Sequence, residues 1–274
     1  YAAQAVAAGA AALVVEHELP LPVPQVIVEN TRIAMAEMAA AFYGYPARGM
    51  RIVGVTGTNG KTSTTYMLKA IAEQCGLKVG LIGTIRNLIG ERIVDTERTT
   101  PESVDLQRIL REMKDEGVQL VVMEASSHSL DQRRVHGIEF ETAVFTNLTQ
   151  DHLDYHKTFE NYLAAKMRIF AQARQAVVNR DDPHAQTILN GLTIPCKTFG
   201  IREQADISAS EIDITTRGVQ FDMHCPLGTI RMYVPIPGLF SVFNAMGAAA
   251  AAIQLGLPLS AVKNGIETMG SVSG

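Results

Sequence analysis

The chain has 274 residues, of which 47% are hydrophobic and 19% charged, and its formal charge at pH 7 is -4. This balance is typical of a globular protein and gives no sign of a nucleic-acid partner. The longest apolar run, 245–253, is far shorter than the roughly 20 residues that a membrane helix needs, so we expect no membrane insertion. Cys75, Cys196 and Cys225 form no C-x-x-C pair. They indicate a reducing compartment and buried packing residues, so we expect a cytoplasmic protein.

The first 47 residues resemble the end of a small α/β domain. The chain starts at Tyr1 without methionine and its first helical pattern has no lead-in strand, so we expect a piece of a longer protein. A strand at Ala12–Val15, a proline-rich turn and a strand QVIVE follow. A helix capped at Asn30 then ends near Gly44. The segment YPARGMR is typical of a linker.

Beyond the linker, apolar strands alternate with helical segments. The strands are RIVGVTG, KVGLIGT, QLVVMEA, TAVFTN and QAVVN, and the helices are TSTTYMLKAIAEQC, PESVDLQRILREMKDEG and FENYLAAKMRIFAQA. This alternation predicts stacked βαβ units around a buried, mainly parallel sheet. After Asp182 the pattern is more β-like, and an alanine-rich helix, Asn244–Leu255, closes the chain. We therefore predict an α/β fold with a smaller β part.

The segment VGVTGTNGKTSTT joins the first of these strands to its helix. It ends in the Gly-Lys-Thr of a phosphate-binding loop, but Val55 replaces the first glycine of the usual G-x-x-x-x-G-K-[ST] pattern. A helix N-terminus attracts phosphate through its unpaired N–H groups. Gly57 and Gly60 would let the backbone approach the phosphates, Lys61 would contact the outer phosphates, and the Thr62 hydroxyl would reach Mg²⁺. The alternative is an accidental glycine-rich turn.

Two further strand ends carry groups suited to a metal. Glu124 directly follows an apolar strand, and His152 lies after the next one. The carboxyl ends of parallel strands meet at one edge of a sheet, where ligand groups gather. A lone glutamate at a strand end is usually just solvated. His152 and His156 have the spacing of a zinc pair, but no third ligand of that type is near.

Taken together, these residues resemble a known family, the ATP-dependent Mur ligases of bacterial cell-wall synthesis, and within it the MurE type, the UDP-N-acetylmuramoyl-tripeptide synthetases. The resemblance is carried by TGTNGKTSTT, ERTTPES, MEASSHSLDQRRV, FTNLTQDHLDYH, YLAAK, NRDDP and PGLFSVFNA. It implies that residues 1–47 are the remnant of an N-terminal UDP-binding domain. Residues 48–274 would be the central P-loop ATPase domain. The C-terminal domain that binds the amino acid would be absent.

The family's reaction joins an amino acid to a UDP-linked muramoyl peptide. The resemblance implies ATP, one or two Mg²⁺ ions, UDP-MurNAc-L-Ala-D-Glu and a diamino acid as cofactors and substrates, and a monomeric enzyme of peptidoglycan synthesis. A carboxylate of the dipeptide would attack the γ-phosphate to give an acyl phosphate, and an amine would then displace phosphate. The sequence leaves open whether the amino acid is meso-diaminopimelate or L-lysine.

The resemblance also assigns site residues. The ATP-binding set is Gly57, Thr58, Asn59, Gly60, Lys61, Thr62, Ser63 and Asn244. The set for the UDP-MurNAc-dipeptide is Thr99, Thr100, Ser126, Gln132 and Arg134. The catalytic set is Lys61, Glu124, His152 and Lys166, and the metal set is Thr62, Glu124, His152 and Lys166. Arg134 suits a carboxylate because a guanidinium binds it in a bidentate fork, although a solvated arginine beside Arg133 is the alternative.

Three positions depart from the family pattern or are given no chemistry. The family often has F-N-x-x-N at the start of its last helix, whereas this chain has Ser241 in place of the first asparagine. Ser241 is therefore left out of the ATP-binding set. Asp181 and Asp182 are expected only to end a strand.

Lys166 lies within an apolar stripe of the predicted helix FENYLAAKMRIF. From the helix alone, a lysine whose stem packs while its ammonium reaches water is favoured. The resemblance reverses this preference, because many Mur ligases carry a lysine carbamylated by CO₂ at this position. A carbamate is anionic and offers the oxygens that hard cations prefer.

Two other functions stay open. A related amide ligase, such as folylpolyglutamate synthase or the ligase half of cyanophycin synthetase, would share the loop, Glu124 and His152. It should lack the TTPES segment and the SSH-x-x-x-x-x-R combination. The other alternative is a nucleotide-binding module that no longer ligates.

Overall fold

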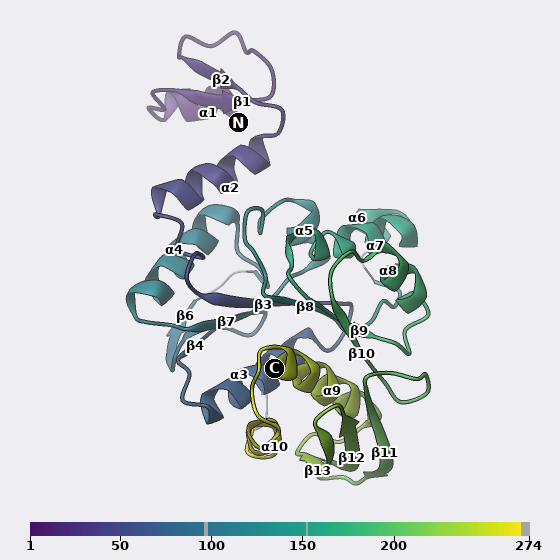
Figure 1. Cartoon of the computed structure of the whole chain (residues 1–274). Helices are drawn as coiled ribbons and strands as arrows, with labels where there is room; N and C mark the ends of the chain where they lie inside the picture. Colours follow the sequence, from purple (N-terminus) through teal and green to yellow (C-terminus); the bar gives the residue numbers. More distant parts are fainter. Residues whose placement is uncertain (96–97, 152, 270–274) are drawn as a thin grey trace.

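The computed structural model describes residues 1–95, 98–151 and 153–269, with the backbone alone at 153. An N-terminal segment projects from the main body (Figure 1). Its elements are α1 (Ala2–Ala7), β1 (Leu13–Val15), β2 (Gln25–Ile27) and α2 (Thr31–Phe42). The Asn30 side chain accepts the N–H groups of Arg32 and Ile33, which confirms the predicted cap of α2. β1 and β2 pair in parallel.

An 11-stranded sheet runs through the main body of the described residues. Its order is β13 (Gly228–Val234), β12 (Val219–Cys225), β11 (Ile207–Ile214), β10 (Cys196–Gly200), β9 (Ala176–Asn179), β8 (Thr142–Phe145), β3 (Arg51–Thr56), β7 (Leu120–Glu124), β4 (Val79–Ile82), β5 (Asn87–Ile89) and β6 (Arg92–Val94). The strands from β11 to β4 are parallel, and both ends of the sheet are antiparallel. The predicted smaller β part therefore continues the main sheet.

Helices cover both faces of the sheet (Figure 1). One face carries α4 (Ser103–Asp115), α5 (Ser127–Asp131), α6 (Leu153–His156), α7 (Phe159–Met167) and α8 (Ala185–Gly191). The other carries α3 (Lys61–Gln74), α9 (Leu239–Gln254) and α10 (Leu259–Glu267). Each face has its own buried core: Val53 and Val55 of β3 pack on the α3 side, and Ile52 packs on the opposite side. Residues of one strand therefore serve two cores, as a buried parallel strand requires.

Three details predicted from the sequence are wrong. The helix from Phe159 ends at Met167, and a short 3₁₀ turn (Phe170–Gln172) carries the rest of the apolar stripe. The alanine-rich helix α9 starts at Leu239, because Gly238 adopts a positive φ of 105° just before it, and it does not close the chain, because α10 follows it. None of the three cysteines is fully buried: Cys75 is exposed at the C-cap of α3, and Cys196 and Cys225 are half-buried.

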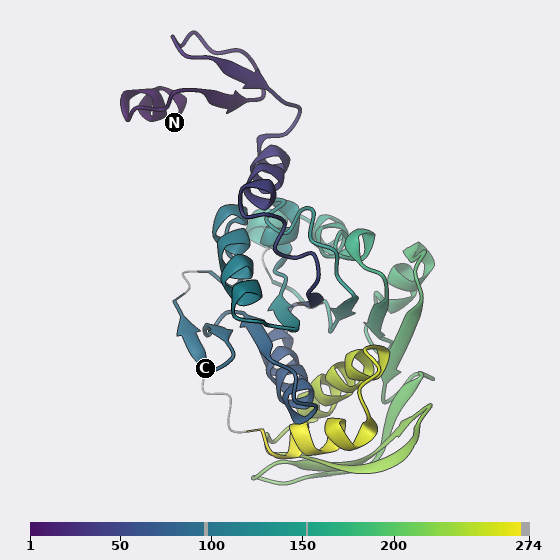
Figure 2. The same cartoon turned by 60° about the vertical axis from the view of Figure 1, so that its left-hand side comes forward.

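The sheet topology brings four strand ends together. β8, β3, β7 and β4 are neighbours in this order and run parallel. Their carboxyl ends therefore place four segments at one edge: the loop after Thr56, Glu124 at the end of β7, Gly83 and Thr84 after β4, and the segment 146–151 after β8. Figure 2 shows the same sheet with the N-terminal segment above it. In the described part of the chain, no helix combines the length and the apolar character that a bilayer crossing needs.

Candidate active site

The loop between β3 and α3 needs its glycines. Gly57 and Gly60 have φ values of 147° and 84°, which side chains rarely adopt. A Cβ on Gly57 would lie 1.9 Å from Thr146 Oγ1, and one on Gly60 would lie 2.2 Å from Asn244 Oδ1. Gly60 is also the N-cap of α3, so the loop ends at a helix N-terminus. This geometry fits a phosphate held by backbone N–H groups.

The segment after β8 holds this loop in place. Thr146 Oγ1 donates to the Asn59 carbonyl at 2.6 Å, and Asn147 Oδ1 accepts the Asn59 N–H at 2.9 Å. The Thr58 N–H donates to the Asn147 carbonyl at 2.8 Å, and the Thr149 N–H donates to Thr58 Oγ1 at 3.0 Å. The motif FTNLTQ contributes to the family resemblance, but the sequence predicts no role for its Thr146, Asn147 and Thr149. Their hydroxyl and amide groups fix the shape of the loop.

Lys61 lies folded back on the loop. Its Nζ donates to the carbonyls of Gly57 at 3.0 Å and Thr58 at 2.8 Å. Burial lowers the pKa of Lys61, and the negative charges of Glu124 and Asp151 oppose this shift. The ammonium is therefore held by carbonyl oxygens at the place where a phosphate would bind.

Glu124 and Thr62 contact one another in the same cavity. Thr62 Oγ1 donates to Glu124 Oε1 at 3.0 Å, and the Glu124 side chain is fully buried. The cavity has a volume of about 260 Å³, and its lining comprises Thr58, Asn59, Gly60, Lys61, Thr62, Ser63, Thr84, Thr99, Glu124 and Ser126. The structure thus brings the predicted phosphate loop and the predicted metal carboxylate together.

A divalent cation fits the Thr62 and Glu124 pair. A hydroxyl and a carboxylate that already lie 3.0 Å apart are both hard oxygen ligands of the kind that Mg²⁺ prefers. Within the described residues, no group of three or more His, Cys, Asp or Glu residues could hold a metal ion by itself. His152, expected in the metal set, lies outside the described residues. His156, considered above for zinc, packs against the rings of Tyr162 and His128, with centroids 5.1 and 5.5 Å away.

Lys166 is buried beside the phosphate loop. Its side chain is among the largest fully buried ones, with the residue 1% exposed. Its Nζ donates to the Gly57 carbonyl at 2.8 Å and lies 4.4 Å from the centre of the Tyr162 ring. Burial, and then the charge of Lys61, hold the pKa of Lys166 well below its usual range, while Asp151 opposes them. The ammonium does not reach water. This excludes the arrangement favoured by the helix pattern alone, in which the stem packs and the ammonium is solvated.

The residues expected to hold the muramoyl peptide lie next to the cavity. Thr99 and Ser126 line it. Thr100 is fully buried, and its hydroxyl donates to the Glu124 carbonyl at 2.8 Å and accepts the Ser126 N–H at 3.2 Å. Thr100 therefore joins two loops of the site.

Arg134 is 9% exposed, which excludes the solvated alternative. Its guanidinium donates to Gln132 Oε1 at 2.6 Å and to the Thr100 carbonyl at 3.0 Å, and it pairs with Glu102 at 3.1 Å. Burial lowers the pKa of Arg134, and Glu102 opposes the shift. Gln132 and Arg134 thus form one unit close to Thr100.

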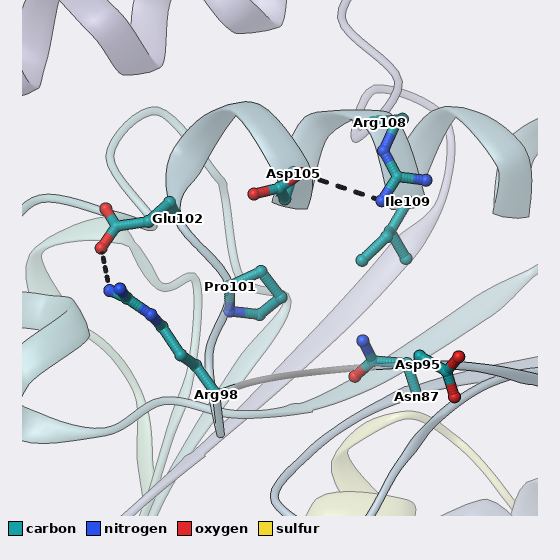
Figure 3. A pocket seen from close by; sticks show the side chains of 8 residues that line it. All are labelled: Asn87, Asp95, Arg98, Pro101, Glu102, Asp105, Arg108 and Ile109. Carbon is teal, nitrogen blue, oxygen red and sulfur yellow. Dashed lines mark hydrogen bonds and ion pairs between the residues drawn. The ribbon is translucent and has the colours of Figure 1, made fainter.

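A larger cavity of about 390 Å³ lies beside this unit, between β5 and α4 (Figure 3). Its lining residues are Asn87, Asp95, Arg98, Pro101, Glu102, Asp105, Arg108 and Ile109. Glu102 pairs with Arg98 at one end, and Asp105 pairs with Arg108 at 3.8 Å (Figure 3). Charges of both signs balance one another here, so we assign no ligand to this cavity.

Asn244 of α9 reaches the loop from the face of the sheet that also carries α3 (Figure 1). It is 6% exposed, and its Oδ1 lies where a side chain on Gly60 would be. Ser241 is fully buried. Asp181 accepts N–H groups of Ile201, Arg202 and Glu203, so it shapes the turn after β10 instead of only ending β9.

Comparisons with known proteins agree with this geometry. A family model described as the Mur ligase middle domain matches residues 55–252. The chain belongs to the Mur ligase family, as its motifs predicted.

The names of individual relatives within this family give a specific reaction. The UDP-N-acetylmuramoyl-L-alanyl-D-glutamate–2,6-diaminopimelate ligase of Geobacillus thermodenitrificans is 44% identical over 283 residues, covering 100% of this chain and 58% of that protein. The ligase of the same name from Alkaliphilus metalliredigens is 46% identical over 277 residues, covering 99% of this chain and 56% of that protein. The chain thus spans a little over half the length of these relatives.

Solved structures give the same picture. A structure of a ligase with this name matches with a TM-score of 0.89 and 31% identity, covering 100% of this chain and 57% of that chain. Mycobacterium tuberculosis folylpolyglutamate synthase, complexed with ADP and AMPPCP, matches with a TM-score of 0.73 and 18% identity, covering 88% of this chain and 63% of that chain. At this identity the second likeness concerns the fold alone. The roles of individual site residues stay predictions.

Proposed function

We propose that this chain is the nucleotide-binding centre of a ligase that joins 2,6-diaminopimelate to UDP-MurNAc-L-Ala-D-Glu at the expense of ATP. The observation that carries this proposal is the single cavity in which the phosphate loop, Lys61 and the Thr62 and Glu124 pair meet Thr99 and Ser126. The names of the relatives at 44% and 46% identity support diaminopimelate as the added amino acid. We also propose a cytoplasmic, monomeric enzyme.

The chemistry follows from the groups in the cavity. A carboxylate oxygen of the dipeptide attacks the γ-phosphorus of ATP while the bond to the ADP oxygen breaks, giving an acyl phosphate and ADP. The amine of the diamino acid then attacks the acyl carbon, phosphate leaves with the bonding electrons, and the amine loses a proton. Such a reaction is accelerated mainly by positioning and charge stabilisation.

The site residues of this chain have distinct roles in this reaction. The loop N–H groups and Lys61 bind phosphate oxygens, and Arg134 binds a carboxylate of the peptide through its fork. Lys61 Nζ rests on two loop carbonyls at 3.0 and 2.8 Å, which it would exchange for phosphate oxygens. Thr62 and Glu124 would hold Mg²⁺. A bound Mg²⁺ neutralises charge on the phosphates.

Replacing Lys61 tests this proposal. In a protein with the full length of the relatives, Lys61→Ala should lower ADP release by at least about 100-fold, because it removes a charge aimed at the transferring phosphate. ADP release should depend on UDP-MurNAc-L-Ala-D-Glu and diaminopimelate. Lys69→Ala is the matched control, since Lys69 lies on the same helix but pairs with Glu73 at its surface.

Near-normal ADP release by Lys61→Ala would place the phosphate site elsewhere. ADP release that responds to folate and glutamate, and not to the muramoyl peptide, would favour a folylpolyglutamate synthase. Tight ATP binding without any ligation product would favour the non-ligating module.

We further propose that Lys166 is carbamylated in the active enzyme. Only the neutral amine attacks CO₂, and burial together with Lys61 keeps the pKa of Lys166 well below its usual range. Attack of Nζ forms an N–C bond, one C=O electron pair moves onto oxygen, and the amine proton passes to solvent. The carbamate keeps one N–H, which can retain the 2.8 Å bond to the Gly57 carbonyl. Its two oxygens add the negative charge that a cation near Glu124 would need.

The carbamate has a direct spectroscopic test. ¹³C-labelled bicarbonate should give a carbamate resonance that Lys166→Ala loses and that Lys114→Ala, at an exposed site on α4, retains. The activity of the full-length Lys166→Ala variant should fall by at least about 100-fold, because a charge beside the metal is lost, and short carboxylates such as acetate should restore part of it. Full activity without the carboxylate would contradict the proposal.

A further inference from the structure

The Glu124 carboxylate is held mainly by Thr84, a residue that no sequence motif singled out. The Thr84 N–H donates to Glu124 Oε1 at 3.0 Å, and the Thr84 hydroxyl donates to Oε2 at 2.9 Å. Thr62 supplies one further bond, to Oε1 at 3.0 Å. Because Thr84 contacts both oxygens, it fixes the plane of the carboxylate as well as its position.

The turn before Thr84 is shaped around the same carboxylate. A Cβ on Gly83 would lie 2.5 Å from Glu124 Oε1, so only glycine leaves room for the carboxylate there. The Gly83 N–H donates to Oδ1 of Asn87, which is fully buried, at 3.2 Å. The turn is therefore fixed from both sides, and Thr84 does not reach Glu124 through a chance surface rotamer.

Thr84 also touches the segment expected to hold the peptide substrate. Its Oγ1 lies 3.0 Å from Thr99 Oγ1, and Thr99 lines the cavity with Lys61 and Glu124. The next residue, Thr100, donates to the Glu124 backbone carbonyl at 2.8 Å. A continuous set of hydrogen bonds thus runs from Thr62 on the nucleotide side, through Glu124 and Thr84, to Thr99 on the peptide side.

We propose that Thr84 is a positioning residue that orients Glu124 toward a divalent cation and couples cation and nucleotide binding to binding of the muramoyl peptide. This inference rests on the proposed function, because the cation and peptide are those of that reaction. Carboxylates that ligate metals are themselves held by hydrogen bonds, and losing such a partner typically costs about 10- to 100-fold in metal affinity. Two ligands that bias one shared element must affect each other's affinity by the same factor.

Thr84→Val tests the first half of the proposal. It keeps the backbone N–H and the shape of the side chain, and it removes the hydroxyl that contacts both Glu124 and Thr99. In a protein of full length, Mn²⁺ affinity in the presence of a non-hydrolysable ATP analogue, measured by electron paramagnetic resonance, should fall about 10- to 100-fold. Thr84→Ser keeps the hydroxyl, so its Mn²⁺ affinity should lie within a few-fold of the wild-type value. Thr268→Val, which removes a hydroxyl bonded to the Asn264 carbonyl in α10, is the control and should bind Mn²⁺ normally.

The second half concerns coupling. The affinity for the analogue with Mn²⁺ is measured by calorimetry with and without UDP-MurNAc-L-Ala-D-Glu. Wild-type protein should show a several-fold difference between the two conditions, and Thr84→Val should reduce this ratio toward one while Thr84→Ser keeps it. A purely structural role of Thr84 would lower thermal stability without changing the ratio.

The possible failures are distinguishable. If wild-type protein binds neither the analogue with Mn²⁺ nor the muramoyl peptide, the proposed function itself fails. If wild-type protein binds both and Thr84→Val matches it in Mn²⁺ affinity and in coupling, the role of Thr84 is overturned. If Thr84→Val does not fold, Thr84→Ser and Gly83→Ala decide. Gly83→Ala keeps the hydroxyl but displaces Oε1, so unchanged Mn²⁺ affinity in Gly83→Ala would also overturn the proposal.

Discussion

At the scale of single residues, the site concentrates positive charge at the phosphate loop, on the half-buried Lys61 and the fully buried Lys166. Nζ of Lys61 and Nζ of Lys166 donate to the same Gly57 carbonyl, at 3.0 and 2.8 Å. Two ammonium groups on one carbonyl repel each other, and burial penalises both charges. Burial lowers the pKa of both lysines, and the charge of Lys61 adds to burial at Lys166, whose pKa lies well below the usual range. A bound polyphosphate, or a carbamate on Lys166, would relieve the repulsion.

The free-energy cost of burying the Lys166 ammonium predicts a gain in stability when Lys166 is replaced by methionine. A lysine whose pKa is lowered by folding binds fewer protons in the folded than in the unfolded state. Its cost is absent above the unfolded pKa of 10.5 and grows as the pH falls toward the folded pKa. In metal-free, bicarbonate-free buffer, Lys166→Met should therefore raise the free energy of unfolding by about 1 kcal/mol or more at neutral pH.

The pH dependence separates this effect from simple packing. Denaturant unfolding of both proteins should show the difference shrinking as the pH rises to about 9.5. In this range the unfolded lysine still binds a proton that the folded one has lost, so a higher pH favours the folded wild-type protein. Lys114→Met, at an exposed position of α4, should show no such trend. A gain that stays constant with pH, or a loss of stability at neutral pH, would contradict the charge argument.

At the scale of secondary structure, apolar strands followed by polar strand ends were predictable. The five strands read from the sequence correspond to β3, β4, β7, β8 and β9, because each is a continuous apolar run that only a doubly covered sheet can bury. The parallel arrangement then made the meeting of Glu124 with the phosphate loop foreseeable. The end of α7 and the start of α9 were not predictable. The apolar stripe of α7 continues into the 3₁₀ turn after Met167, and α9 starts after Gly238 because of the positive φ of this glycine.

The supports of the site were harder to foresee. Thr84, Thr146 and Asn147 stand at strand ends, where threonine and asparagine usually meet only water. Their role depends on which strands are neighbours: Thr84 reaches Glu124 because β4 lies beside β7, and Thr146 reaches the loop because β8 lies beside β3. Strand order is a property of the whole sheet and leaves no mark on a single segment. The one local signal was the uninterrupted motif FTNLTQ itself.

At the scale of the whole molecule, the N-terminal segment meets the main body through α2 and α4 (Figure 2). Arg32 of α2 pairs with Glu102 at 3.0 Å, and Glu102 also pairs with Arg134 at 3.1 Å. Glu102 thus connects the segment before the expected domain boundary at residue 47 with a guanidinium expected to bind the peptide. The boundary itself stays a prediction. The arrangement places the peptide residues where two parts of the chain meet, while the phosphate loop belongs to the main body alone.

Because the phosphate loop lies in the main body alone, we expect a protein of these 274 residues to bind nucleotide without completing the reaction. The phosphate loop, Lys61 and the Thr62 and Glu124 pair are all present, so calorimetry should detect binding of ATP with Mg²⁺ and its loss in Lys61→Ala. The matched family model is a middle domain, and the relatives named as ligases are longer than this chain, which covers 58% of one of them. Closure of further parts over the nucleotide is a common requirement for finishing such a site. Mass spectrometry of a reaction with ATP, UDP-MurNAc-L-Ala-D-Glu and diaminopimelate should therefore find no tripeptide product, whereas protein of the full length should form it. Tripeptide made by the 274 residues would show that the main body carries the complete ligase site.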